Sequence, residues 1–154
     1  MIRPAQQKDI AQIGELYYEL FDQMQKYEPE YMKSSHPDQE FLQSIIGQEN
    51  NFVAFVYETD SEINGFVIAQ MQDSPKDDCF VPQKCVYLMD IIVAPHKRGQ
   101  GVGRALMQEI EKWAKEKGVD YLELNVLTTN EAAIQLYTKE GYTSFSKSMR
   151  KRIV

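Results

Sequence analysis

A strand that runs into a glycine-rich basic turn, which opens directly into a helix, constrains the fold of this chain more than any other feature. The pattern occupies residues 91–106, with Gly99, Gly101 and Gly103 at alternate positions. Such a turn presents free backbone N–H groups and the positive end of a helix dipole to an anion, most naturally a phosphate or pyrophosphate. Glycines let the backbone approach the ligand without interference from Cβ atoms. The pattern therefore predicts an anion site between a strand and a helix.

Two common phosphate-binding motifs do not fit this spacing. A P-loop has four residues between its glycines and then Lys-Ser or Lys-Thr, which this turn lacks. A dinucleotide fingerprint has glycines at relative positions 1, 3 and 6, and position 6 counted from Gly99 is Arg104. That fingerprint also lies early in a βαβ unit, whereas this turn lies about two-thirds of the way along the chain. Both motifs are excluded.

The remaining pattern is Arg98-Gly99-Gln100-Gly101-Val102-Gly103. It resembles the acyl-CoA pyrophosphate loop of the GCN5-related N-acetyltransferase (GNAT) family, whose pattern is Gln/Arg-x-x-Gly-x-Gly/Ala. A second signature of that family follows downstream, as Asn130-Glu131-Ala132-Ala133-Ile134-Gln135-Leu136-Tyr137 and then Gly141-Tyr142. The resemblance is close over roughly residues 85–145 and weaker over the first 75.

Length and composition bound the fold and its surroundings. A chain of 154 residues predicts one domain, here an N-acetyltransferase domain over 1–154 with an acyl-CoA-binding core at about 85–145. The sequence has no run of 18 apolar residues, so we expect no membrane-spanning helix. The first residues lack the apolar core of a signal peptide, so we expect a cytoplasmic protein. Cys79 and Cys85 have no neighbouring His or Cys cluster, which predicts thiols without a metal site.

Charge is unevenly spread along the chain. The net charge is −6, but residues 94–104 carry +3 and residues 15–40 carry −5. A positive site for a polyanionic cofactor and a negative surround for a cationic acceptor would produce this pattern, and so would solvated helix faces in the acidic part. The acidic balance argues against nucleic acid as a partner. Tyr17, Tyr18, Phe21, Tyr27 and Tyr31 lie among these acids and suit an amine with an apolar body, although Tyr17 and Phe21 also fit a core stripe.

Hydrophobic periodicity and turn signals predict the elements. We expect strands at 2–5, 51–58, 63–71, 85–93 and 121–126, with two short strands or one bent strand over 142–153. We expect helices at 10–28, 38–46, 104–118 and 130–140, the first of them capped by Asp9. Strand, helix and strand across 85–126 imply a parallel crossover. The predicted fold is α/β and GNAT-like: a mixed, largely antiparallel sheet of six to seven strands with a parallel central pair and about four helices.

The resemblance implies where an acyl-CoA cosubstrate binds. Backbone groups of Ile91, Ile92 and Val93 would hold the pantetheine arm like an added strand, and an N–H there would polarise the acyl carbonyl. Main-chain N–H groups would bind the pyrophosphate, from Arg98, Gly99, Gln100, Gly101, Val102, Gly103 and Arg104. The alternative is a strand-to-helix turn in which glycine serves only tight packing.

Tyr137 corresponds to the leaving-group acid of the family, and Asn130 to a further cofactor contact. Seven residues make two helical turns, within about 20° of zero rotation and a rise of roughly 10 Å, so both side chains share a helix face. A phenol has a pKa of about 10 and a thiol about 8.5, which favours a hydrogen bond to the thiolate over full proton transfer. The alternatives are a helix cap for Asn130 and a core position for Tyr137.

The base that deprotonates the amine is the least determined part of the site. Asp90 is the best candidate, because it directly precedes the proposed pantetheine contacts Ile91–Val93. Glu28 and Glu123 are weaker candidates. Strand parity could equally turn Asp90 away from the cleft. The polyamine-acetylating branch of the family has Leu-Glu-Asp where this chain has Leu88-Met89-Asp90, so Met89 argues against a polyamine acceptor.

The resemblance implies an N-acetyltransferase that moves an acetyl group from acetyl-CoA directly to a primary amine, without a metal. A small cationic amine is favoured as the acceptor, and a protein amino group is the other option. A second copy of the chain in a homodimer is one further partner to consider; a membrane is not. The alternative is a non-catalytic acyl-CoA-binding module or sensor on the same fold.

Overall fold

The computed structural model describes the whole chain, residues 1–154. Its strands are β1 (Ile2–Pro4), β2 (Phe52–Thr59), β3 (Glu62–Asp73), β4 (Lys84–Val93) and β5 (Tyr121–Leu124). They form one sheet in the order β1-β2-β3-β4-β5, in which β4 and β5 pair in parallel and all other neighbours are antiparallel. The predicted mixed, largely antiparallel sheet with one parallel pair is confirmed.

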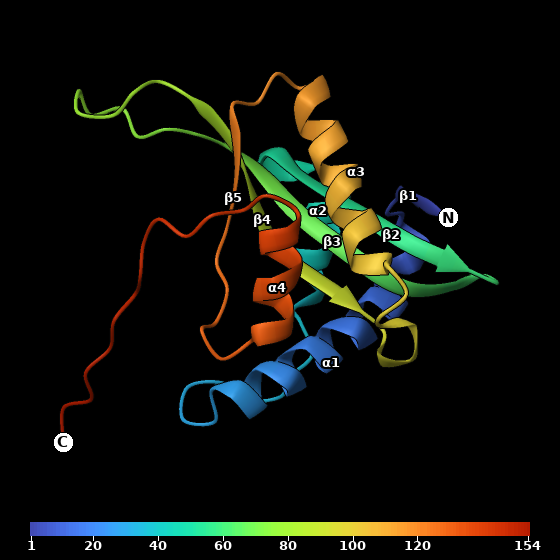
Figure 1. Cartoon of the computed structure of the whole chain (residues 1–154). Coiled ribbons are helices and arrows are strands. Elements are labelled where there is room, and N and C mark those ends of the chain that lie inside the picture. Colours follow the sequence, from blue (N-terminus) through green and yellow to red (C-terminus); the bar gives the residue numbers. More distant parts are fainter.

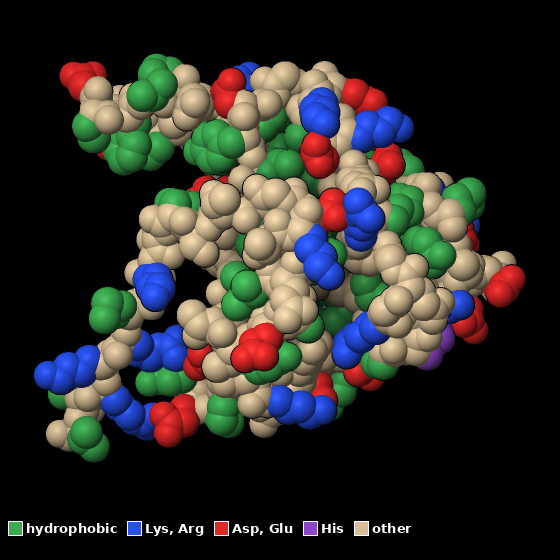
Figure 2. All heavy atoms as spheres, viewed as in Figure 1, with side chains coloured by type: hydrophobic (Ala, Val, Ile, Leu, Met, Phe, Trp, Pro, Cys, Tyr) green, Lys and Arg blue, Asp and Glu red, His purple; other side chains and the backbone are tan.

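The predicted strand count is wrong, because the sheet has five strands and not six or seven. The strands expected over 142–153 are not formed, and this segment has neither helix nor strand. A strand requires a neighbour for its backbone N–H and C=O groups, and no backbone hydrogen bond joins residues 143–154 to another part of the chain. In Figures 1 and 2 the segment leaves the body of the molecule as an extended arm. The parallel pair consequently lies at one edge of the sheet.

Four helices cover the sheet, as predicted: α1 (Ile10–Tyr27), α2 (Gln39–Ile46), α3 (Val102–Glu116) and α4 (Glu131–Lys139). Because α3 connects the parallel strands β4 and β5, the predicted crossover is confirmed. Figure 1 shows α3 and α4 together on the near face of the sheet. Helices α1 and α2 contribute to a separate apolar cluster on the opposite face.

Two apolar clusters, one on each face of the sheet, hold the layers together. Ile13 and Tyr17 of α1 pack with Phe66 of β3 on one face. Leu106 and Ile110 of α3 pack on the other face. Residues three and four apart on a helix share one face, so the apolar spacing in α1 and α3 directs each helix onto the sheet. Burial of apolar surface on both faces makes the sheet the centre of the fold.

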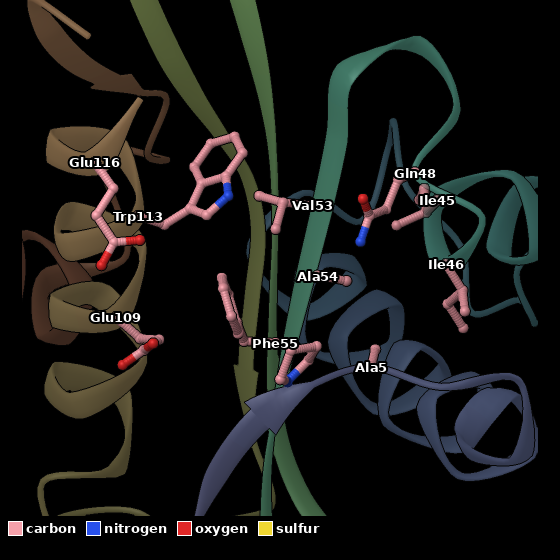
Figure 3. A pocket seen from close by; sticks show the side chains of 11 residues that line it. Ala5, Ile45, Ile46, Gln48, Val53, Ala54, Phe55, Glu109, Trp113 and Glu116 are labelled. Carbon is pink, nitrogen blue, oxygen red and sulfur yellow. The ribbon is translucent and has the colours of Figure 1, made fainter. Parts of the chain in front are cut away.

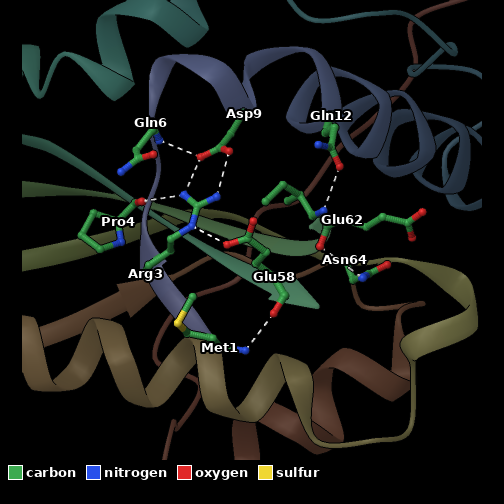
Figure 4. A network of polar contacts seen from close by, with 10 residues as sticks. Met1, Arg3, Pro4, Gln6, Asp9, Gln12, Glu58, Glu62 and Asn64 are labelled. Carbon is green, nitrogen blue, oxygen red and sulfur yellow. Dashed lines mark hydrogen bonds and ion pairs between the residues drawn. The ribbon is translucent and has the colours of Figure 1, made fainter. Parts of the chain in front are cut away.

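Asp9 does not cap α1 as predicted, because its carboxylate is engaged elsewhere (Figure 4). It accepts hydrogen bonds from both terminal nitrogens of the Arg3 guanidinium, at 2.7 and 2.9 Å, and from the backbone N–H of Gln6 at 2.8 Å. The Nε of Arg3 donates to Glu58 at 2.7 Å. This network joins β1, the start of α1 and β2.

Candidate active site

The pairing between the parallel strands β4 and β5 ends about halfway along β4. Cys85 to Leu88 pair with Tyr121 to Leu124, but β4 continues to Val93 with β3 as its only neighbouring strand. The stretch Met89–Val93 therefore has one edge without a strand partner. In open α/β sheets, ligands bind in the crevice beyond the carboxyl ends of parallel strands. The predicted pantetheine contacts, Ile91, Ile92 and Val93, lie in this stretch.

A β-bulge at Met89 determines which way Asp90 faces. Ile68 of β3 lies opposite Asp90 and Ala69 lies opposite Leu88, so Met89 has no partner. Without the bulge, Asp90 would follow Leu88 onto the face covered by α3, because alternate residues of a strand share a face. The extra residue reverses this alternation and turns Asp90 toward α1.

Asp90 meets the buried hydroxyl of Tyr17, which donates a hydrogen bond to its Oδ2 at 2.7 Å. The Tyr17 ring packs on Phe66, with ring centroids 4.7 Å apart, which fixes the phenol in place. Burial raises the pKa of Asp90, and the hydrogen bond from Tyr17 opposes that shift. No Lys or Arg forms an ion pair with Asp90. The carboxylate is thus partly buried and held by one neutral donor.

A cavity of about 120 Å³ lies beside the unpaired stretch of β4 and brings the predicted residues together. It is lined by Leu20, Gln23, Met24 and Tyr27 of α1, Met89, Asp90 and Ile91 of β4, and Asn125, Val126, Leu127, Asn130 and Tyr137. Asp90 is the only carboxylate among these residues. One cavity therefore contains both predicted catalytic groups.

Tyr137 and Asn130 enter the cavity from α4 and the residue before it. Burial raises the pKa of the Tyr137 phenol, and the charge of Asp90 raises it further. The Tyr137 hydroxyl has no hydrogen-bond partner within the chain, so its proton is available to a ligand. Asn130 caps α4, since its Oδ1 accepts from the Ala133 N–H at 3.2 Å. Asn130 is thus a helix cap that also lines the cavity.

The glycine turn lies between β4 and α3, as predicted, and two of its glycines have positive φ angles. Gly99 and Gly101 have φ angles of +74° and +82°, in the left-handed region that glycine adopts without strain. Gly101 occupies the N-cap of α3 and has no side chain to accept from the first amides of the helix. A Cβ on Gly103 would touch Leu136 of α4 at 3.4 Å, so this glycine also serves close packing.

Arg98 joins the turn to the cavity. Its Nε donates to the carbonyl of Val93 at 3.0 Å, and its Nη2 donates to Gln23 at 3.3 Å. Gln23 lines the cavity from α1. At the other side of the turn, Arg104 forms an ion pair with Glu140 at 2.7 Å, just after α4. The turn and the cavity therefore belong to one continuous surface, with amides and cations at one end and a carboxylate and a phenol at the other.

The sequence model of the acetyltransferase (GNAT) family matches residues 14–142 of this chain, and these residues include every part of the surface described above. The chain belongs to the GNAT acetyltransferase family.

Relatives in this GNAT family share parts of the sequence. An uncharacterized N-acetyltransferase of Methanocaldococcus jannaschii is 28% identical over 146 residues, which is 92% of this chain and 59% of the relative. Streptothricin acetyltransferase of Streptomyces lavendulae is 43% identical over 53 residues, 34% of this chain and 28% of the relative. Thialysine N-epsilon-acetyltransferase of Bos taurus is 41% identical over 56 residues, 36% of this chain and 33% of the relative. The chain spans less than two thirds of the length of each.

Solved structures with the same GNAT fold match the whole chain. A mutant of the BH1408 protein from Bacillus halodurans superposes with a TM-score of 0.94 at 22% identity and covers 100% of this chain and 99% of its own. The aminoglycoside N-acetyltransferase AAC(6')-Iy in complex with CoA superposes with a TM-score of 0.73 at 19% identity, covering 100% and 99%. These likenesses establish the fold, and both include residues 143–154.

The GNAT fold places two of the predicted base candidates away from the cavity. Glu28 lies just after α1 and forms an ion pair with Arg150 at 2.9 Å. Glu123, on β5, is not among the lining residues either.

The spacing of Tyr17 in α1 predicts a core position, and its ring does pack in the core, but its hydroxyl contacts Asp90. Gln23 carried no sequence signal that singled it out.

A second, larger cavity of about 230 Å³ contains none of these groups. Figure 3 shows that it straddles β2, with Trp113 and Phe55 on the α3 side and Ile45 and Ile46 on the α2 side. Its walls are mainly apolar, and no predicted site residue lines it.

None of the helices combines the length and apolar character needed to cross a bilayer.

Proposed function

We propose that this chain transfers an acetyl group from acetyl-CoA directly to a primary amine. The observation that carries the proposal is the single cavity in which Asp90 and Tyr137 lie together beside the unpaired edge of β4. Acyl transfer from a thioester needs donors for the acyl oxygen, a base for the amine and a stabilised leaving thiolate. Each requirement has a group within this surface.

The cosubstrate is proposed to lie along β4 with its diphosphate at the glycine turn. The pantetheine arm would add beside Ile91, Ile92 and Val93, where β4 has no strand partner. The amides from Arg98 to Arg104, at the start of α3, would bind the diphosphate. Arg98, whose guanidinium forms no ion pair, lies in this turn and would add positive charge. Asn130 would contact the ligand from the opposite wall.

The reaction then follows from the two side chains in the cavity. The neutral amine nitrogen attacks the thioester carbonyl carbon, a C–N bond forms, and a backbone N–H of β4 stabilises the negative oxygen. The C–S bond breaks, and the thiolate accepts a hydrogen bond from the Tyr137 hydroxyl. Asp90 takes the proton that the amine loses and passes it to water. Partial burial raises the pKa of Asp90, which makes this carboxylate a stronger base than a free one.

The acceptor is proposed to be a small cationic amine with an apolar portion. Asp90 supplies the only negative charge among the lining residues, and Leu20, Met24 and Tyr27 supply apolar walls. The cavity of about 120 Å³ is open to solvent, so it would hold the reacting amine group while the rest of the acceptor extends outward. A protein amino group, presented on an exposed side chain, is the second acceptor class to test.

We also propose that residues 1–154 act as one domain. One sheet runs through the chain, and each of its faces is covered by a helix layer with its own apolar cluster. The acyl-CoA-binding core at about 85–145 contains β4, α3, β5 and α4 but depends on α1 for Tyr17 and Gln23.

The deciding experiment measures free thiol released from acetyl-CoA with a panel of primary amines, alongside calorimetric binding of acetyl-CoA. Binding with amine-dependent thiol release supports the transferase. Binding without turnover for any amine, including peptide amino groups, supports the sensor alternative. No heat of association at millimolar acetyl-CoA rejects both.

A matched pair of glycine variants tests the diphosphate site. Gly101 and Gly118, at opposite ends of α3, have φ angles of +82° and +68°, and neither has an atom within 4 Å of an added Cβ. Alanine at either position therefore imposes a similar backbone cost of about 1 kcal/mol. We expect Gly101→Ala to raise the Kd of acetyl-CoA about tenfold, while Gly118→Ala leaves it within about twofold. Equal effects of both variants on Kd would remove the glycine turn from the binding site.

A further inference from the structure

The larger cavity, of about 230 Å³, lies where β1 ends and β2 continues. The N–H of Ala5 donates to the carbonyl of Ala54 at 2.9 Å, and this is the last backbone hydrogen bond between the two segments. At Phe52 and Val53, the edge of β2 that faces β1 has no strand beside it. Helix α3 covers one face of the sheet and α2 the other, so the cavity lies over this uncovered edge, between the two helices (Figure 3).

One wall of this cavity combines an aromatic ring with two carboxylates. Glu109, Trp113 and Glu116 are four and three residues apart on α3, so they share one face of the helix. Figure 3 shows the Trp113 indole reaching from α3 toward Val53 of β2. Ile46 of α2 lines the opposite side, and most of the remaining wall is apolar. The cavity therefore offers an apolar interior with negative charge along one wall.

The carboxylates of this wall have no close cationic partner. No Lys or Arg lines the cavity, and Glu116 forms no ion pair. The Nζ of Lys112 is 3.9 Å from Glu109, which is too far for a hydrogen bond. The Nζ of Lys117 is 6.0 Å from the centroid of the Trp113 ring, at the outer limit of a cation–π contact. Two negative charges and an aromatic ring are therefore available to a ligand.

We propose that this cavity binds a small organic cation with an apolar chain, at a site separate from the cavity of Asp90 and Tyr137. The cationic group would lie near Glu109 and Glu116 and against the Trp113 ring, because both carboxylates and aromatic rings attract cations. The chain would lie along the apolar walls over the uncovered edge of β2. An anion would meet two carboxylates instead. The two cavities share no lining residue, so this proposal does not rest on acetyl transfer.

Trp113 is the only tryptophan of the chain, so its fluorescence reports on this cavity directly. The probe is hexyltrimethylammonium chloride, a quaternary cation that has no N–H and cannot be acetylated. We expect a saturable shift of the emission to shorter wavelength, because the probe displaces water from the indole, with a Kd of about 1 mM or lower. Tetramethylammonium lacks the chain and hexanoate lacks the cation, so each should bind at least about tenfold more weakly.

A matched pair of variants on α3 tests where the cation binds. Glu116→Gln removes a carboxylate that lines the cavity, whereas Glu111→Gln removes one that pairs with Lys115 at 2.6 Å and lies outside it. We expect the Kd of the probe to rise about fivefold in the first variant and to stay within about twofold in the second. The probe should also raise the thermal midpoint of Glu111→Gln more than that of Glu116→Gln. Circular dichroism verifies that both variants are folded.

Three results would overturn the proposal. The first is the absence of a saturable change in Trp113 emission up to about 10 mM probe. The second is an equal affinity for hexanoate, because the carboxylates would then play no part in recognition. The third is an equal rise of the Kd in both variants, which would reflect the net charge of α3 and not the cavity. No titration contains acetyl-CoA, so these results are independent of acetyl transfer.

Discussion

Two aspartates, Asp9 fully buried and Asp90 partly buried, show how differently one side chain is used in this molecule. Asp9, 2% exposed, accepts two hydrogen bonds from the Arg3 guanidinium and one from a backbone N–H, and the Arg3 hydrogen bond lowers its pKa. Asp90 has one neutral donor, Tyr17, and no cation, and burial raises its pKa. The first has a fixed partner for each bond, whereas the second faces a cavity.

The difference separates structural from chemical use of a buried charge. A carboxylate compensated by a fixed guanidinium contributes to the fold and has no capacity left for a ligand. A carboxylate with incomplete compensation costs stability and is kept where its charge is needed by something that binds. Asp90 therefore has the capacity to bind a cationic group of a ligand, whereas Asp9 does not. The same substitution at the two positions should separate their roles.

Asp90→Asn should have the largest effect on catalysis. Losing a general base costs typically about 100- to 1000-fold in kcat/KM, and the acid limb of the pH–rate profile should disappear with it. The thermal midpoint should hold or rise, because an uncompensated buried charge is removed. Steady-state thiol release and thermal unfolding measure both. If kcat/KM stays within about threefold of wild type, Asp90 is not the base.

Tyr137→Phe should come next. A hydrogen bond to a charged group contributes about 1.5–3 kcal/mol, which predicts a fall in kcat of about 10- to 100-fold. Because the bond strengthens only as charge builds on sulfur, the Kd of acetyl-CoA should change by no more than about twofold. Turnover slowed by this factor, with normal calorimetric binding of acetyl-CoA, is the expected result. A kcat equal to that of wild type removes Tyr137 from the mechanism.

Asp9→Asn should instead lower stability, by about 2 kcal/mol in denaturant unfolding, and leave kcat/KM of the folded protein within about twofold. Because the folded pKa of Asp9 lies below its unfolded value, its stabilisation is complete above the unfolded pKa and is lost as the pH falls through the folded one. Wild type should therefore lose more stability than the variant below about pH 4. Parallel pH dependence of the two proteins would contradict this account.

The sequence predicted the features that depend on neighbouring residues, such as the four helices and the glycine turn before α3. The glycines at alternate positions marked a tight turn into a helix, and Gly99 and Gly101 do form that turn, with positive φ angles that the sequence pattern did not predict. The direction of Asp90 was not readable, because the bulge at Met89 arises from pairing with β3, about twenty residues earlier, and Met89 has no distinguishing chemistry. The strands expected over 142–153 are not formed, because no backbone hydrogen bond joins residues 143–154 to another part of the chain.

The hydrogen bond from Tyr17 to Asp90 is a second feature that the sequence pattern did not predict. Its spacing in α1 places it on the core stripe, and its ring is buried there against Phe66. Nothing in a helical repeat indicates that the hydroxyl reaches a carboxylate 73 residues away. Periodicity reports which face of a helix is buried, but not which polar atom at the end of a buried ring finds a partner.

Tyr17→Phe should have the smallest and most selective effect, through Asp90. The Tyr17 hydroxyl stabilises the ionised carboxylate, so its removal raises the pKa of Asp90 further. The acid limb of kcat/KM should move to higher pH, while the plateau above it stays within about twofold of wild type. Tyr57→Phe, on β2 and away from the cavity, is the matched control and should leave the limb in place. A purely structural Tyr17 would lower the plateau without moving the limb, because packing energy does not depend on the protonation of Asp90.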